Sequence, residues 1–223
     1  MARTSACRFV LLLLYIFLSA MAVHADERAP MVDAVRSVVS VLPEWPRGQR
    51  NAQQPEGSGV VVGDGSGGQV IVTAWHVISK ARSIRVRTHD GVVHLAQRVG
   101  HDVPSDLAVL RVAMLDNARA AMFADAPVEL AAPVCSIGNA FGLGLSVTCG
   151  VVSATRRAGV GFNRVEDFVQ TDAAVNPGAS GGGLFTRDGR LAGILSAIFT
   201  KQSDANIGVN FAVSAELAAR ITK

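Results

Sequence analysis

The sequence contains few aromatic and few charged residues, which make up 5% and 17% of its 223 positions. It also lacks low-complexity tracts, coiled-coil heptads and the strand–helix alternation of a doubly wound parallel sheet. These absences exclude fibrous, disordered and Rossmann-like chains. Instead, short runs rich in Val and Ile, separated by turn residues, follow one another from Gly57 onward. This punctuation predicts an all-β fold made of antiparallel barrels or a sandwich.

A break near Met122–Pro127 divides the predicted strands into two halves of similar size. We therefore expect one half over residues 26–124 and a second over residues 125–223. The C-terminal AELAARITK has helical spacing, and Ser214 precedes it as a potential N-cap. A short C-terminal helix is expected there.

Residues 1–25 have the layout of a secretory signal peptide. Arg3 and Arg8 precede the apolar run FVLLLLYIFL, and small residues surround Ala22 and Ala25. The run is shorter than the roughly 20 residues that span a bilayer, so a retained membrane anchor is the less favoured alternative. We predict an exported protein, periplasmic or secreted, that meets a membrane only if the leader is retained.

The charge of the exported chain gives no reason to expect binding to nucleic acid. The full sequence has a net charge of +3, and the loss of two arginines with the leader brings the mature chain close to neutrality.

Only three cysteines are present, and Cys7 belongs to the leader. Cys135 and Cys149 flank a Gly-rich turn, so they form either a cross-strand disulfide or two buried free thiols. No histidine stands at ligand spacing beside them, so we predict no metal site and no cofactor.

Three segments carry chemistry. His76 in TAWHV follows an apolar strand, and Asp106 in SDLAVL leads another, where a buried carboxylate needs a partner such as an imidazole N–H. Ser180 in NPGASGGG follows a Pro-Gly turn, which can direct the N–H groups of Gly178 and Ser180 to one point, an oxyanion hole. Taken singly, each segment also has a structural explanation: a satisfied histidine, a turn cap or a glycine-rich hairpin.

The order of these residues distinguishes two kinds of hydrolase. Gly178, Ser180 and Gly182 also match the nucleophile elbow of α/β-hydrolases, which requires a histidine after the serine. The last histidine is His101, so the elbow is excluded. The order His, Asp, Ser is that of a chymotrypsin-type triad. Asp102 and the histidines at 89, 94 and 101 are the weaker local competitors.

Five motifs in order resemble the protease domain of the HtrA/Deg family, from about Val32 to Val213: TAWHV, SDLAVL, SIGNAFGLGLSVTCGVVSA, QTDAAVNPGASGG and IGVNFAV. The resemblance implies two six-stranded antiparallel β-barrels packed together and a serine endopeptidase that hydrolyses exported, unfolded or damaged polypeptides. It implies that His76 is the general base, Asp106 its orienting partner and Ser180 the nucleophile. It also suggests a homotrimer, for which the segment Met31–Leu42 is the candidate interface; the alternative is that these residues only cover the barrel.

The chain departs from the family pattern at two positions near the nucleophile. Ala179 replaces an Asn and Gly183 replaces a Pro, which puts the resting conformation of the oxyanion loop in question. The chain stops soon after the protease motifs, so we expect no PDZ domain, and the polar loop Pro43–Glu56 is short for the family.

The S1 pocket of such a fold is walled by the segment before the nucleophile and by a later strand. The corresponding residues carry no charge, so we predict small or medium aliphatic P1 residues. These residues are Ala173, Ala174, Val175, Leu195, Ser196 and Ala197. Three alternatives to a protease are a catalytically quiet peptide-binding or chaperone-like module on the same fold, a non-proteolytic esterase, and an all-β structural protein.

Overall fold

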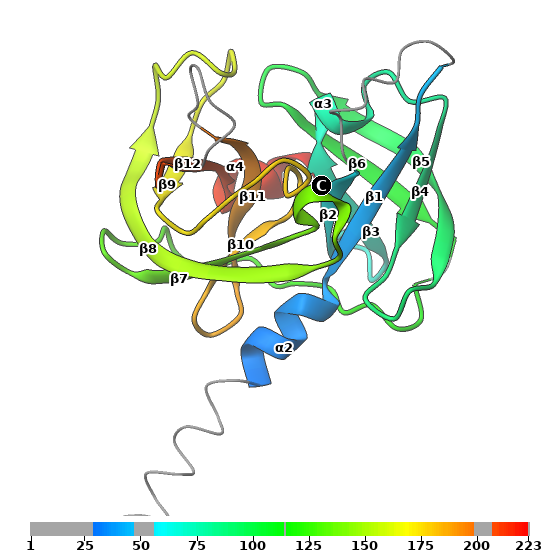
Figure 1. Ribbon diagram of the computed structural model, residues 1–223, viewed down its shortest axis with the longest axis horizontal. Coiled ribbons are helices and arrows are strands. Elements are labelled where there is room, and N and C mark those ends of the chain that lie inside the picture. Colours follow the sequence, from blue (N-terminus) through cyan, green and yellow to red (C-terminus); the bar gives the residue numbers. More distant parts are fainter. Residues whose placement is uncertain (1–28, 47–55, 114, 199–206, 223) are drawn as a thin grey trace, which may run out of the picture.

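The computed structural model describes residues 29–46, 56–113, 115–198 and 207–222, and omits the side chains of residues 197 and 198. The predicted leader lies outside these residues. The described residues form two closed antiparallel barrels of six strands each, side by side in Figure 1, which confirms the predicted fold class. None of the helices within them is long and apolar enough to span a membrane.

The first barrel has the strand order β1-β2-β3-β6-β5-β4. The helix α2 (Ala29–Arg36) leads into it, and the short helix α3 (Trp75–Ile78) follows β3. Its strands are β1 (Val38–Glu44), β2 (Gly57–Gly63), β3 (Gln69–Ala74), β4 (Ser83–Arg87), β5 (Val93–Asp102) and β6 (Leu107–Val112). Valine and isoleucine suit these pleated, buried surfaces because their branched side chains pack well against neighbouring strands.

The second barrel has the strand order β10-β11-β12-β9-β8-β7. Its strands are β7 (Pro133–Gly138), β8 (Ser146–Arg157), β9 (Phe168–Thr171), β10 (Gly183–Thr186), β11 (Leu191–Ile198) and β12 (Asn210–Ser214), with the 3-10 turn η1 (Ala140–Gly142) between β7 and β8. The predicted boundary at residues 124–125 falls in the connection between β6 and β7.

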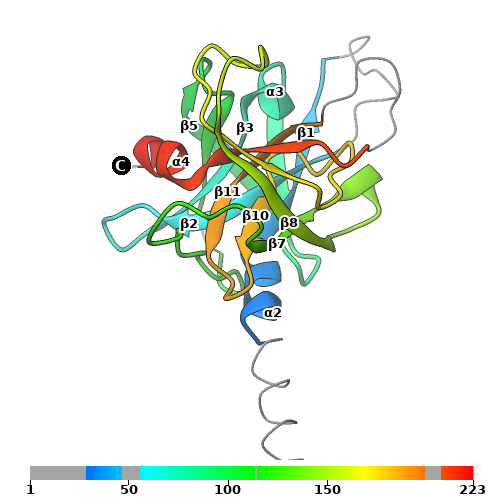
Figure 2. The same cartoon turned by 90° about the vertical axis from the view of Figure 1, so that its left-hand side faces the viewer.

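The helix α4 (Ala215–Ile221) closes the chain and contacts strands of both barrels, β5 and β6 of the first and β11 and β12 of the second. Figure 2 shows it beside β11. Ser214 caps it as predicted, since its hydroxyl accepts the N–H of Leu217 at 3.2 Å.

One apolar core joins the two barrels. It contains Val60, Val72 and Leu107 from the first barrel together with Phe168 and Phe185 from the second, all fully buried. Burial of this shared surface holds the barrels together and fixes the seam where the predicted site residues lie.

Candidate active site

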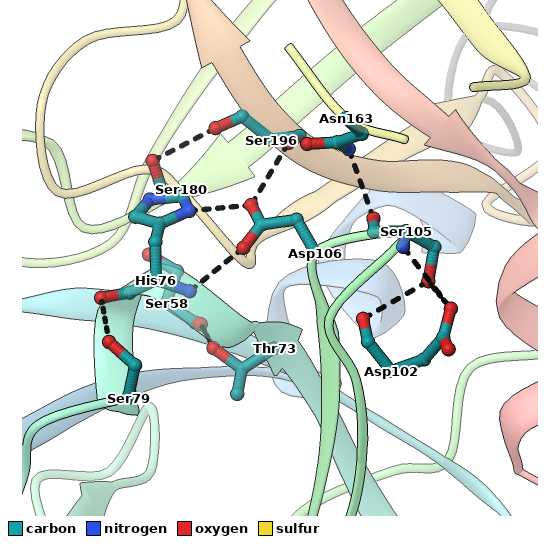
Figure 3. Close-up of polar contacts among 10 residues, drawn as sticks. All are labelled: Ser58, Thr73, His76, Ser79, Asp102, Ser105, Asp106, Asn163, Ser180 and Ser196. Atoms are coloured by element: carbon teal, nitrogen blue, oxygen red, sulfur yellow. Dashed lines mark hydrogen bonds and ion pairs between the residues drawn. The ribbon is translucent and has the colours of Figure 1, made fainter. Parts of the chain in front are cut away.

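His76 and Asp106 form a doubly bonded pair. The Nδ1 atom of His76 lies 2.6 Å from Oδ2 of Asp106, and the backbone N–H of His76 donates to Oδ1 at 2.8 Å (Figure 3). The carboxylate is mostly buried, with 14% of its side chain exposed, whereas the imidazole is 50% exposed. The buried carboxylate therefore holds the imidazole through Nδ1, and the other ring nitrogen makes no hydrogen bond to any described residue.

Local backbone structure explains this placement. His76 follows the apolar strand β3, as predicted, but it lies in the short helix α3, one residue after the first helical position, which was not predicted. Asp106 immediately precedes β6 with a positive φ of 59°, a conformation that Asp tolerates better than most residues. Its carbonyl accepts the N–H of Trp75 at 2.8 Å. The N–H groups of two successive residues, Trp75 and His76, thus both bond Asp106, and these bonds fix the imidazole and the carboxylate relative to the barrel.

Ser180 stands at the end of a tight turn in the second barrel. The N–H of Ala179 donates to the carbonyl of Asn176 at 2.9 Å, and Gly178 has a φ of 97°, as a type II turn requires at its third residue. A Cβ on Gly178 would lie 2.4 Å from the carbonyl oxygen of Asn139, so the position also needs glycine for space. The predicted Pro-Gly turn is present.

The turn leaves two N–H groups unbonded. Every carbonyl from Pro177 to Ser180 accepts a hydrogen bond, from Phe141 N, Ser58 Oγ, Gly182 N and Ser58 N in that order. Among the described residues no acceptor meets the N–H of Gly178 or of Ser180. A pair of unsatisfied donors beside a serine is the arrangement that stabilises a developing oxyanion.

His76, Ser180 and Gly178 line one cavity of about 190 Å³, together with Trp45, Glu56, Gly57, Val77 and Pro177. The hydroxyl of Ser180 donates to the carbonyl of Ser196 at 3.4 Å, and within the described chain no hydrogen bond joins it to His76. The carboxylate of Glu56 on the cavity wall pairs with Arg87 at 3.0 Å, which offsets its charge. The cavity thus brings together an imidazole, a hydroxyl and two free N–H donors.

The remaining predicted positions are placed as follows. Asp102 accepts hydrogen bonds from the N–H and the hydroxyl of Ser105 and caps a turn away from the imidazole. Ala173 and Leu195 are fully buried and do not line the cavity, so the S1 assignment stays a prediction.

In the structure Cys135 and Cys149 face each other across β7 and β8 and are joined by a disulfide.

Three polar residues around the site were not assigned these roles from the sequence. Ser58 bonds the oxyanion turn, Asn139 donates to Glu56 at 2.8 Å, and the hydroxyl of Ser196 lies 3.4 Å from Oδ2 of Asp106. The only sequence signal for Ser58 is a polar residue in the otherwise apolar run GSGVVVG. That signal does not indicate which residue the Ser58 hydroxyl bonds.

Comparisons with known proteins agree with this geometry. The family model for trypsin-like peptidase domains matches residues 57–194. The chain is 38% identical over 176 residues to the periplasmic serine endoprotease DegP of Escherichia coli (strain K12), which covers 78% of this chain and 36% of that protein. It is 36% identical over 167 residues to a probable DegP-like periplasmic endoprotease of Buchnera aphidicola, covering 74% and 35%.

Solved structures show the same fold. The HtrA-type protease AlgW with a tripeptide superposes with a TM-score of 0.77 at 35% identity, over 87% of this chain and 61% of that one. A serine endoprotease from Yersinia pestis gives a TM-score of 0.70 at 32% identity, over 87% and 64%. The chain spans about a third of the length of its curated relatives. Since the matched segment exceeds half of the chain and holds His76, Asp106 and Ser180, the chain belongs to the family of trypsin-like peptidase domains, with HtrA-type serine proteases among its relatives.

Proposed function

We propose that this chain is a serine endopeptidase that cleaves polypeptides through an acyl-enzyme. The observation that carries the proposal is a cavity lined by His76, Gly178 and Ser180, in which the imidazole is bonded to Asp106 and the N–H groups of Gly178 and Ser180 are unbonded. His76 removes the proton of Ser180, Asp106 orients the imidazole and stabilises its charged form, and Ser180 attacks the peptide carbonyl. The N–H groups of Gly178 and Ser180 receive the oxyanion. The C–N bond then breaks as His76 gives its proton to the leaving amine, and water, deprotonated by His76, hydrolyses the acyl-enzyme and restores Ser180.

One rearrangement precedes the attack. The hydroxyl of Ser180 donates to the carbonyl of Ser196 in the resting structure, so its proton must turn from that carbonyl to the free nitrogen of His76. Catalytic hydrogen bonds are often long in unliganded enzymes and tighten when substrate binds. His76, Asp106 and the turn already have their bonds, so we expect the change to be confined to Ser180.

The substrates we propose are exported polypeptides, unfolded or damaged, with small or medium aliphatic P1 residues. The names of the DegP relatives include "periplasmic", which supports an exported location for this chain. A homotrimer through Met31–Leu42 belongs to the same proposal and has the resemblance as its support.

The competing function is a catalytically quiet, peptide-binding module on the same fold. The collapsed oxyanion turn that it requires would satisfy or bury the N–H groups of Gly178 and Ser180. Their unbonded state favours the enzyme.

A fluorophosphonate probe tests the two functions. The proposed enzyme forms one covalent adduct, mapped by peptide mass spectrometry to Ser180, and cleaves casein. Ser180→Ala removes the label, and Ser180→Ala or His76→Ala each lowers the rate of casein cleavage by several powers of ten. A folded wild-type chain that is neither labelled nor active would refute the proposal and leave the binding module.

A further inference from the structure

Ser58 is a buried serine to which the proposed mechanism assigns no role. It lies near the start of β2 in the first barrel, with no exposed surface. Buried hydroxyls are costly unless they are bonded, and Ser58 is bonded at every polar atom. Its carbonyl accepts the hydroxyl of Thr73 at 2.6 Å, as drawn in Figure 3.

Its other bonds reach across to the second barrel. The hydroxyl of Ser58 donates to the carbonyl of Gly178 at 2.8 Å, and its N–H donates to the carbonyl of Ser180 at 2.8 Å. The same hydroxyl accepts the N–H of Asn139 at 2.8 Å, which fixes the direction of its own proton. One residue therefore holds the carbonyls on both sides of Ala179.

These two bonds hold the peptides on either side of the one that carries the free N–H of Ser180. A trans peptide is planar, so its C=O and N–H groups turn as one unit. The N–H of Ser180 belongs to the peptide between the two held carbonyls, and Gly178 lacks the Cβ that would otherwise restrict its backbone. Loss of the bond to Gly178 therefore frees the most flexible residue of the turn.

We propose that Ser58 is a positioning residue for the oxyanion hole, acting through the carbonyls of Gly178 and Ser180. This inference rests on the proposed peptidase function. It makes the second barrel's oxyanion turn depend on a hydroxyl from the first barrel.

The test is Ser58→Ala, assayed with a chromogenic peptide and a peptide aldehyde that forms a tetrahedral adduct with Ser180. Misplacement of a catalytic group by about 1 Å can cost about a hundredfold in rate. We expect kcat to fall by about tenfold to a hundredfold with KM within about twofold, and aldehyde affinity to fall in parallel with kcat.

The matched control is Ser37→Ala. Ser37 is also a buried serine and directly precedes β1. Its hydroxyl donates to the carbonyl of Ala34 at 2.7 Å, so it does not bond the oxyanion turn. This variant should keep the wild-type kcat. Near-ultraviolet circular dichroism verifies that each variant is folded, and rates are expressed per folded molecule.

Ser58→Cys serves if Ser58→Ala does not fold, because a thiol has similar size and is a weaker donor. Its kcat should lie below the wild type, again with unchanged KM. Folded variants with wild-type kcat, or with a loss confined to KM, would overturn the role of Ser58 while leaving the peptidase intact. An inactive wild type would instead refute the proposed function itself.

Discussion

Gly183 is packed against the largest side chain of its own strand. A Cβ placed on it would lie 2.2 Å from a ring carbon of Phe185, which is fully buried. Real Cβ atoms do not approach that closely, so the ring occupies the space that a side chain at 183 would need. Glycine at 183, where the family has Pro, therefore leaves room for the aromatic ring of Phe185 two residues later. Ala179, the other departure, lies in an apolar cluster with Val175 and Leu184.

Gly183→Ala is expected to lower the free energy of unfolding by roughly 1–3 kcal/mol, because overpacking forces the Phe185 ring out of place. Urea titration measures this. Gly63→Ala is the control, since a Cβ there meets no atom within 4 Å. In a Phe185→Leu background the cost should shrink. Equal effects at 183 and 63 would contradict this account of the packing.

The loop between β8 and β9 is organised by one carboxylate. Glu166 accepts the backbone N–H groups of four residues, at positions 160 to 163, at 2.7–3.1 Å. Burial opposes ionisation, but the four bonds outweigh it and lower the pKa of Glu166 below its ordinary value. The loop also bonds the turn before Asp106. The side-chain amide of Asn163 donates to the carbonyl of Ser105 at 3.1 Å, and the N–H of Val165 donates to the carbonyl of Pro104 at 2.9 Å.

The lowered pKa predicts how acid acts on this loop. The charged form of Glu166 is favoured in the folded protein, so its stabilisation is complete above the ordinary pKa and is lost as the pH falls through the lowered one. Glu166→Gln should lower the melting temperature at pH 7, and the difference from the wild type should shrink toward pH 3. Glu129→Gln, at an exposed position, should change little at either pH. A difference that stays constant with pH would contradict the assignment.

Elements and their local chemistry could largely be predicted from the sequence. The strands show as Val-rich runs, and His76, Asp106 and Ser180 each lie in a short motif whose partners follow from their order. The bonds of the Ser58 hydroxyl could not be predicted. Its partners, Asn139 and Gly178, lie 81 and 120 positions away and contribute backbone atoms, which leave no mark in the sequence. The helical position of His76 depends on one turn of backbone after β3, which periodicity does not resolve.

At the scale of the whole molecule, the barrels share one core and one site. Phe168 and Phe211 of the second barrel pack with their ring centroids 5.6 Å apart, in the cluster that contains Val60 and Leu107 of the first. Both tryptophans of the chain, Trp45 and Trp75, belong to the first half. Their fluorescence therefore reports on one barrel while substitutions are made in the other.

We expect Phe168→Ala to cost about 3–5 kcal/mol and to lower the midpoint of the tryptophan-detected transition, although Phe168 is in the second barrel. The reason is that a shared core makes the two barrels unfold together. The same midpoint should appear by far-ultraviolet circular dichroism. Leu130→Ala, at a position 68% exposed, is the control. A tryptophan transition that ignores Phe168→Ala would mean that the barrels unfold independently.

The crossing bonds of Ser58 restrict how such a chain can be recombined. Consider a hybrid that joins this first barrel to the second barrel of a distant homologue. Each barrel keeps its own strand pairing, but the oxyanion turn keeps its conformation only if the homologue's turn meets the Ser58 hydroxyl as residues 178–180 do here. Compatibility at that junction, more than the folding of either half, decides whether the grafted molecule turns over substrate.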